Sequence, residues 1–154
     1  MIARTCLLMV PLLAGCSLRD PASEAPVDLK PGKYDIVASG KSYIEIEPSS
    51  QSGSRCFSDF EAREFARFPM RKATRLWRGC SDTDEPRKGN AVNGKRYCKG
   101  AEFRDDDEST YTYVAEIDTD GEGFVIKGET RDKEDGSGPD SGPWRVIGRR
   151  VGDC

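Results

Sequence analysis

The sequence predicts a mostly β domain, an antiparallel meander sheet or an open barrel with one short helix, stabilised by disulfides. Short runs of strand-forming residues alternate with turns rich in glycine, aspartate and proline along most of the chain. Helical spacing of apolar residues is evident in one stretch, near residues 59–68. Beyond residue 16 there are four cysteines, an even number that is typical of a disulfide framework in an exported chain.

The first residues predict export. Arg4 precedes an apolar run that ends in Leu13-Ala14-Gly15-Cys16, which is the layout of a secretory signal peptide. The alternative is an uncleaved membrane helix, but such a helix needs about 20 apolar residues. This run is shorter and is interrupted by Pro11, so a cleaved signal peptide is favoured.

The tetrapeptide that ends this run resembles a bacterial lipobox. The resemblance implies that the chain is cut before Cys16 and that this residue is acylated, so that the membrane is a partner through the lipid anchor at Cys16. Ser17 after it resembles the sorting pattern for the periplasmic face of the outer membrane in a Gram-negative cell. We therefore expect a lipoprotein signal peptide over residues 1–15, a lipidated flexible tether over 16–28, and a single β-rich domain over 29–154.

The composition limits the classes of function. Hydrophobic residues make up 36% of the chain and charged residues 33%, with a net charge of −3, so the core is expected to be small. Charges of both signs are interspersed, so we expect no nucleic-acid partner. The chain has no histidine, which removes histidine-based catalysis and histidine-ligated metal sites. We accordingly expect no enzymatic activity and no cofactor.

The four remaining cysteines allow three disulfide connectivities. We favour Cys80 with Cys98, on two neighbouring strands joined by a polar, turn-rich stretch over residues 81–90. Cys56 would then pair with Cys154 and close the domain end to end. The other two pairings stay open, because spacing alone does not fix connectivity.

In the first half of the domain, residues 34–38 and 43–47 have the pattern of a β-hairpin, and in the second run apolar and charged residues alternate. Ser58 is a suitable N-cap for a helix over 59–68, which Pro69 would end. A strand is predicted over 73–80.

The predicted helix carries aromatic and basic side chains. Four phenylalanines, Phe57, Phe60, Phe65 and Phe68, fall on one side of a helical wheel and would pack against a sheet. Basic residues lie beside and after them: Arg63, Arg67, Arg71, Lys72, Arg75 and Arg78. These cations would either be simply solvated or form a patch that contacts anionic lipid or a cell-wall polymer.

The second half predicts strands over 91–99, 111–117, 124–130 and 144–151. The loop over 118–129 has the residue spacing of a calcium-binding EF-hand loop, with oxygen-bearing or small residues at Asp118, Asp120, Glu122, Gly123 and Glu129. Strand-forming residues flank the loop where an EF-hand needs helices, so an ordinary hairpin is favoured. A calcium-binding hairpin is retained as an alternative.

Four stretches resemble a proteobacterial envelope family known as domain of unknown function 3617. They are residues 29–34, residues 56–62, the middle cysteines Cys80 and Cys98, and the terminal heptad over 148–154. The resemblance implies a small exported domain with paired cysteines and brings no established activity.

The favoured interpretation is a non-catalytic binding or envelope-interaction module in the periplasm. A hydrolase that uses two carboxylates, for example Glu45 with Glu129, is the second alternative beside the calcium hairpin.

Overall fold

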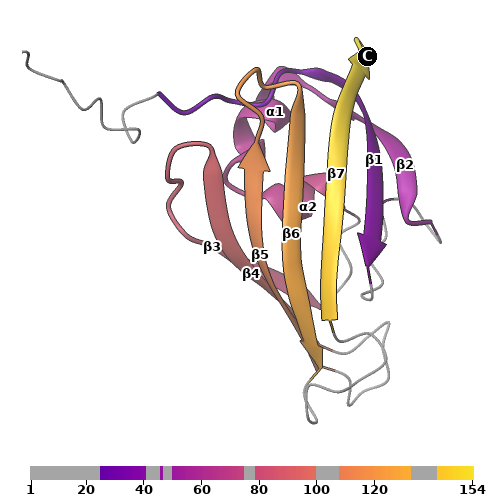
Figure 1. Ribbon diagram of the computed structural model, residues 1–154, viewed down its shortest axis with the longest axis vertical. Coiled ribbons are helices and arrows are strands. Elements are labelled where there is room, and N and C mark those ends of the chain that lie inside the picture. The colour runs from indigo at the N-terminus through magenta and orange to yellow at the C-terminus, as the bar shows by residue number, and fades with distance from the viewer. Residues whose placement is uncertain (1–24, 41–45, 47–49, 75–78, 100–107, 133–141) are drawn as a thin grey trace, which may run out of the picture.

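The computed structural model of the chain describes residues 25–40, 46, 50–74, 79–99, 108–132 and 142–154 (Figure 1). Within these ranges the chain forms seven strands and two short helices. Their order is β1 (Gly32–Gly40), β2 (Ser52–Phe57), α1 (Asp59–Phe65), α2 (Pro69–Ala73), β3 (Cys80–Asp84), β4 (Ala91–Lys99), β5 (Glu108–Ile117), β6 (Gly123–Asp132) and β7 (Gly142–Gly152).

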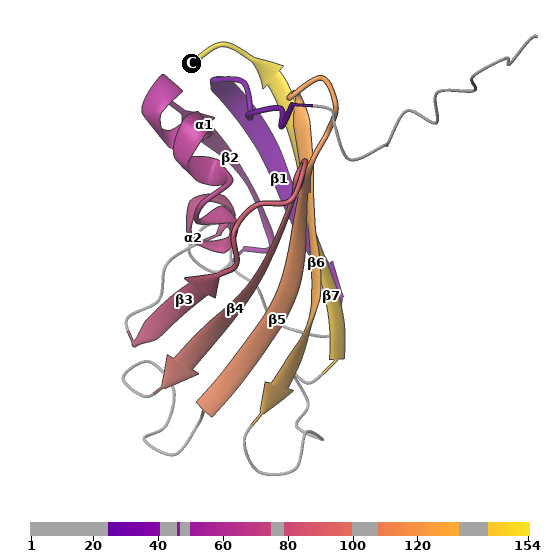
Figure 2. The ribbon, with the colours of Figure 1, turned by 90° about the vertical axis from the view of Figure 1, so that its left-hand side faces the viewer.

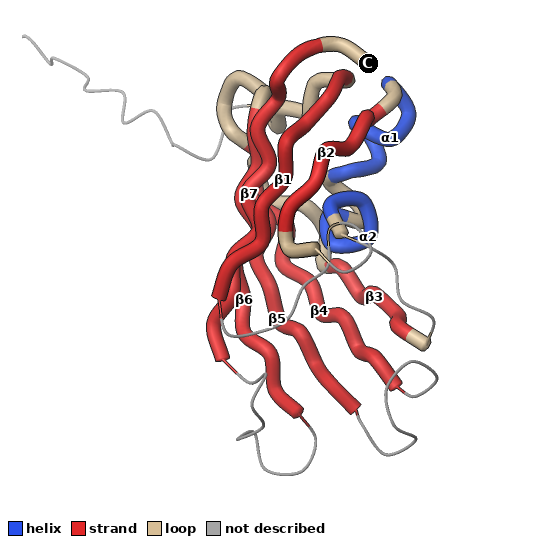
Figure 3. Tube along the Cα trace, turned by 90° about the vertical axis from the view of Figure 1, so that its right-hand side faces the viewer, coloured by secondary structure: helices blue, strands red, loops and turns tan. Residues whose placement is uncertain are grey.

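These strands form a single antiparallel sheet in the order β2-β1-β7-β6-β5-β4-β3. From β3 to β7 each strand pairs with its neighbour in sequence, and β7 then pairs with β1. The sheet curls into a half-barrel, and both helices lie on its concave side near the open edges (Figure 2, Figure 3). The predicted mostly β, antiparallel fold is confirmed.

The helical part differs from the prediction of one helix. α1 ends at Phe65, and α2 begins at Pro69. Proline has no amide hydrogen and a fixed φ that suits the first helical turn, so Pro69 starts a helix here. The side chains of Pro69, Met70 and Ala73 are buried. This burial stabilises a helix that would be too short to form alone.

β3 lies later in the sequence than predicted. Ala73 belongs to α2, residues 75–78 lie outside the described ranges, and β3 occupies a stretch predicted as a turn. Two aspartates point to the concave side of this strand, which local propensity disfavours. They are tolerated because Arg96 and Tyr113 hold them from the neighbouring strands.

β1 does not form the predicted hairpin with residues 43–47. It pairs instead with β2 and β7, with Tyr34 opposite Arg55 on one side and Arg150 on the other. Residues 43–45 and 47 lie outside the described ranges, whereas Ile46 is buried in a bend. The serines and glycine that begin β2 form an edge strand through main-chain hydrogen bonds, which leave no apolar pattern in the sequence.

An aromatic cluster joins α1 to the sheet. The ring of Phe65 lies 4.5 Å from that of Phe124 and 5.8 Å from that of Phe57, and Tyr34 lies 5.2 Å from Phe57, all between centroids. These four side chains are among the largest that are fully buried. Aromatic pairs at such separations contribute about 0.5–1.5 kcal/mol each beyond the area that they bury.

Phe60 does not join this cluster and is 65% exposed. Its predicted place on the apolar side is wrong because Phe57 belongs to β2 and the helix starts only at Asp59. Within α1 the residues that face the sheet are Ala62 and Phe65. Phe60 precedes Ala62 by two positions, or about 200° of helical rotation, and therefore points to solvent.

A row of alternating glycines and aromatic residues crosses the middle of the sheet. Gly94, Tyr113, Gly128, Trp144 and Gly40 lie opposite one another on β4, β5, β6, β7 and β1. A Cβ atom on Gly128 would lie 2.8 Å from the Trp144 ring, and one on Gly94 would lie 2.5 Å from the Tyr113 ring. The aromatic rings therefore lie across the glycines, which lets the sheet curl tightly along this row.

Substitution of Gly128 by alanine tests the row. We expect Gly128→Ala to lower the free energy of unfolding by about 2 kcal/mol or more, because its Cβ would also lie 2.0 Å from the main-chain oxygen of Thr112. Gly89→Ala is the control: Gly89 has a φ of 58° and open space around it, so only about 1 kcal/mol of backbone strain is expected. Urea denaturation measures both, and equal losses would contradict the steric argument.

Candidate functional site

The outward face of the two helices gathers basic side chains around the exposed ring of Phe60. We call this set the helical surface: Phe60, Arg63, Arg67, Arg71 and Lys72. The Lys72 ammonium lies 5.7 Å from the centroid of the Phe60 ring, and Arg63, Arg67 and Arg71 are exposed. An apolar ring held among cations is the combination that suits an interface between water and anionic lipid.

Two acidic residues of α1, Glu61 and Glu64, have partners in or next to the helix, whereas Asp59 is exposed in its first turn. Glu61 accepts a hydrogen bond from the main-chain amide of Ser58, 3.1 Å away, and Ser58 in turn caps the helix. This amide hydrogen bond lowers the pKa of Glu61. Glu64 lies 3.3 Å from the Arg67 guanidinium. The central carbon of that guanidinium lies over the Phe68 ring, 5.6 Å from its centroid. The sequence therefore forms a capped helix whose acids stabilise it internally.

The segment that enters the domain is fixed at the same end of the sheet as α1 and the C-terminus (Figure 1). The amide of Lys30 donates to the Gly121 oxygen at 2.9 Å, and Arg87 holds Asp28 at 2.7 Å. The hydroxyl of Tyr34 donates to the main-chain oxygens of Lys30 and Gly121, and burial raises its pKa to about 12. The described chain thus begins at the same end of the sheet as α1, on the side away from the helices (Figure 2).

The residues of the predicted calcium loop are not brought together as a binding site. Asp118 lies 2.7 Å from Arg149, Asp120 accepts the amide of Glu122, and Glu122 lies 3.0 Å from Lys30. Glu129 stands opposite Thr112, well along β6 from the turn. No group of three or more potential metal ligands occurs among the described residues. The loop forms the ordinary β5–β6 hairpin.

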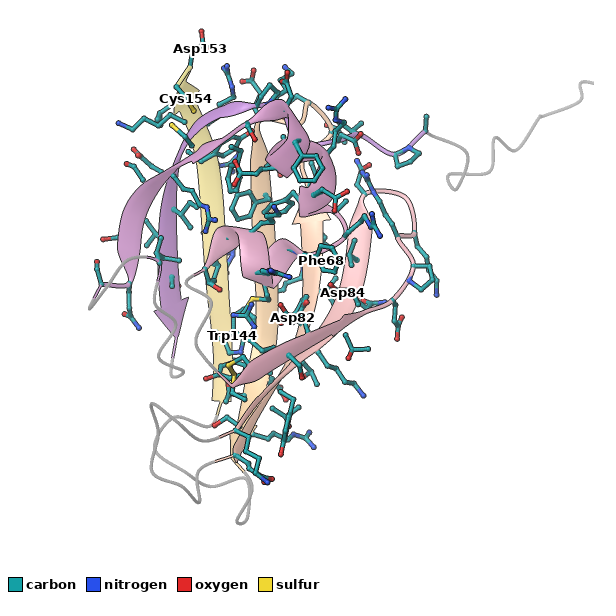
Figure 4. The ribbon with its side chains drawn as sticks, turned by 180° about the vertical axis from the view of Figure 1, so that it is seen from behind. Phe68, Asp82, Asp84, Trp144, Asp153 and Cys154 are labelled. Carbon is teal, nitrogen blue, oxygen red and sulfur yellow. A yellow bond between two sulfur atoms is a disulfide. The ribbon has the colours of Figure 1, made fainter. Side chains whose placement is uncertain are left out.

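A buried polar cluster lies on the concave side between β3, β4 and α2 (Figure 4). Arg96 binds Asp82 through two nitrogen–oxygen contacts of 2.7 and 3.1 Å and donates to Thr74 at 3.0 Å. The side chains of Arg96 and Asp82 are only 4% and 7% exposed. Thr74 donates in turn to the Met70 oxygen at 2.6 Å. The cluster thereby ties the end of α2 to the sheet.

Asp84 and Tyr113 form the second part of this cluster. The Tyr113 hydroxyl donates a short hydrogen bond to Asp84, and the other carboxylate oxygen of Asp84 is buried without a partner. Burial raises the pKa of Asp84, and burial together with the Asp84 carboxylate raises the pKa of Tyr113. A carboxyl group in this setting favours its protonated form.

Only one member of the carboxylate pair given as an example for hydrolysis can be placed. Glu129 lies on the outer face of β6, and Glu45 lies outside the described ranges. The structure instead brings together Asp82 and Asp84, which sequence reasoning missed. The sequence did contain a signal for this ion pair. If Cys80 lies opposite Cys98 in an antiparallel pair of strands, then Asp82, two residues after Cys80, lies opposite Arg96, two residues before Cys98.

A hollow of about 470 Å³ lies on the opposite, outer face of the sheet. Exposed side chains of β4, β5 and β6 line it, among them Lys95, Thr112 and Glu129. The buried carboxylates face the other side of the sheet, so the cluster and the hollow do not form one site.

The cysteines behave as two different pairs. Cys80 and Cys98 form the predicted disulfide, with an S–S length of 2.02 Å. Cys56 and Cys154 are exposed free thiols, so the second predicted bond is not formed in this structure. Their side chains nevertheless meet, and the contact with Cys56 is the largest cause that raises the pKa of Cys154. Cys16, the predicted lipidation site, lies outside the described ranges.

Comparisons of this chain with protein-family models, with curated proteins and with solved structures find no match. Among the described residues, the helices are too short or too polar to cross a membrane.

The ion pair of the buried cluster gives a stability test. Arg96→Met leaves the Asp82 carboxylate buried and uncompensated, so we expect a loss of about 3–5 kcal/mol in the free energy of unfolding. The double variant Arg96→Met with Asp82→Leu removes both charges and should recover most of that loss. Urea denaturation of the three proteins measures this, and equal losses in the single and double variants would contradict a buried, mutually compensating pair.

The raised pKa of Asp84 predicts a pH dependence. The folded chain binds the proton of the Asp84 carboxyl more tightly than the unfolded chain does. Asp84 therefore contributes stability below the pKa that it has in the unfolded chain, and this contribution is lost as pH rises through its pKa in the folded chain. We expect the wild-type free energy of unfolding, relative to that of Asp84→Asn, to fall as pH rises above about 4, the ordinary pKa of an aspartate. A difference between the two proteins that does not vary with pH would show that Asp84 is not perturbed.

Proposed function

We propose that the protein is an exported, lipid-anchored, non-catalytic domain that contacts anionic lipid through the helical surface. The observation that carries the proposal is the 65% exposed ring of Phe60, whose centroid lies 5.7 Å from the Lys72 ammonium. The two helices and the turn between them also expose Arg63, Arg67 and Arg71. The predicted anchor at Cys16 would bring the domain to the periplasmic face of the outer membrane, where this surface meets phospholipid head groups.

The energetics favour such a contact. Each lysine or arginine close to an anionic leaflet contributes about 1 kcal/mol, and an aromatic ring that leaves water contributes about 1.5–3 kcal/mol when fully buried. Neither term alone gives tight binding, but a lipid anchor makes the contact intramolecular and raises the effective concentration. Phe60 supports lipid over a polar cell-wall polymer, because an exposed apolar ring gains most at the boundary of the acyl chains.

The placement of the tether supports the same orientation. Eight residues separate Cys16 from the first described residue, Ala25, and the nine Cα–Cα steps between them span at most about 30 Å. The segment after Ala25 crosses the end of the sheet at which α1 lies (Figure 1). An anchor at Cys16 would therefore hold the helical surface within reach of the bilayer.

The carboxylates of the calcium alternative, and the buried Asp82, have structural partners. Asp118 and Glu122 are held by Arg149 and Lys30, and Asp82 by Arg96. These ion pairs join separate parts of the sheet and its entering segment.

Intact-mass measurement of the protein extracted from its membrane tests the predicted location. We expect a chain that starts at Cys16 and carries the added mass of acyl groups. A chain that retains residues 1–15 without added acyl mass would contradict the anchor.

Vesicle flotation tests the lipid contact with residues 17–154, whose β-rich circular dichroism is checked first. Binding to phosphatidylglycerol vesicles should weaken by about 30-fold or more in Arg63→Glu with Arg71→Glu, and about tenfold in Phe60→Ser. The matched control is Lys95→Glu with Arg145→Glu, two exposed cations of the outer face, which should change little. Equal loss in both double variants, or binding to isolated peptidoglycan instead of vesicles, would contradict the proposal.

A further inference from the structure

The chain keeps two thiols in contact at the end of the sheet where the C-terminus lies. Cys56 is in β2 and Cys154 follows β7, and β1 runs between these strands, with Lys33 opposite both Cys56 and Gly152. Gly152 has a φ of 156°, a backbone conformation that glycine adopts readily and that lets the last residues turn across the end of β1. The label of Cys154 in Figure 4 marks this end of the molecule.

Other contacts hold the C-terminal residues in this place. The Arg150 guanidinium donates to the Pro31 oxygen at 2.9 Å and also to the carboxylate of Asp153. The amide of Phe57 donates to the Cys154 sulfur, and the Cys154 thiol shares a hydrogen bond with that of Cys56. The two sulfurs are therefore positioned by β2 on one side and by an arginine clamp on the other.

The two cysteine pairs differ in access. Cys98 is 3% exposed and its bond to Cys80 lies against the core. Cys56 and Cys154 are both exposed. Thiols and disulfides that solvent reaches exchange readily, whereas enclosed ones resist reduction.

We propose that Cys56 and Cys154 form a thiol–disulfide exchange site, which reacts with the disulfide of a small thiol or of an exported thiol oxidoreductase. One of the two cysteines, as its thiolate, attacks one sulfur of that disulfide and forms a mixed disulfide, and the first partner thiol leaves. The thiolate of the other cysteine then attacks the cysteine sulfur of the mixed disulfide and releases the second partner thiol. Two thiols of this chain are oxidised, one partner disulfide is reduced, and the two protons pass to the released thiolates.

The contact between the thiols places each sulfur where it can resolve an adduct on the other. The Cys154 thiol meets that of Cys56, and this contact raises the pKa of Cys154. Whichever sulfur attacks first, the second lies next to the mixed disulfide and can displace the partner from it.

Closure of the bond ties the C-terminus to the strand that precedes α1. The closed loop contains about 100 residues, and the chain-entropy model predicts marked stabilisation for a loop of that length, equivalent to a rise of roughly 10 °C in Tm. Oxidation at this site would thus stiffen the end of the domain that bears the helical surface, whether or not that surface binds lipid.

The test uses the full chain, purified in detergent and equilibrated over a range of ratios of reduced to oxidised glutathione. Thiols are trapped by alkylation in acid and assigned to peptides by mass spectrometry. We expect Cys56 and Cys154 to convert between dithiol and disulfide across this range while Cys80–Cys98 stays closed, with a rise of roughly 10 °C in Tm on closure. A pair that is open at every ratio, closed at every ratio, or reduced together with Cys80–Cys98 would overturn the proposal.

Single variants test the second step. With oxidised glutathione, Cys154→Ser should accumulate a lasting adduct on Cys56, and Cys56→Ser one on Cys154, whereas the wild type should keep neither, because its second thiol displaces the glutathione. A glutathione adduct that persists on the wild type would overturn the proposal. The double variant Cys56→Ser with Cys154→Ser is the folding control, and its Tm should match that of the reduced wild type.

Discussion

The structure depends on how the sheet bends across its middle. Aromatic side chains of β5 and β7 lie over glycines of their neighbours, so each ring fills the space that the glycine leaves empty. This arrangement covers exposed backbone and permits a curl that flat, evenly substituted strands would resist. The curl in turn creates the concave side that receives α1 and α2 (Figure 2). The same row brings Tyr113 to Asp84, which extends the packing into the buried polar cluster.

Much of this architecture follows from local sequence patterns. Strands β4 to β7 alternate apolar and polar residues between glycine-rich turns, so period and turn chemistry were sufficient to predict them. The pairing of Cys80 with Cys98 also fixed the register between β3 and β4. β2 escaped prediction because its serines and glycine join the sheet by main-chain hydrogen bonds alone. α2 escaped because a five-residue helix depends on the burial of Met70 and Ala73, which only the fold provides.

The candidate site, like the fold, could be predicted from the sequence only in part. The cations of the helical surface were visible in the sequence, but the outward direction of Phe60 required the true start of α1 at Asp59. The buried acids were hidden because Asp82 and Asp84 are typical turn residues, and their role emerges only when Arg96 and Tyr113 lie opposite. Two sets of charges therefore differ in role. Arg96 and Asp82 are paired on the concave side and tie α2 to the sheet, whereas the cations of the helical surface are exposed.

The depth of residue 60 in a bilayer tests the membrane contact of the helical surface most directly. Phe60→Trp in the lipid-anchored protein places a fluorophore on the helical surface, and Thr112→Trp places one on the outer face of β5. The vesicles are phosphatidylglycerol with bromine on the acyl chains. We expect the bromine to quench the fluorescence of the tryptophan at position 60 beyond the quenching seen in the wild type. The tryptophan at position 112 should not be quenched. Equal quenching at both positions, or none at 60, would contradict a membrane contact through the helical surface.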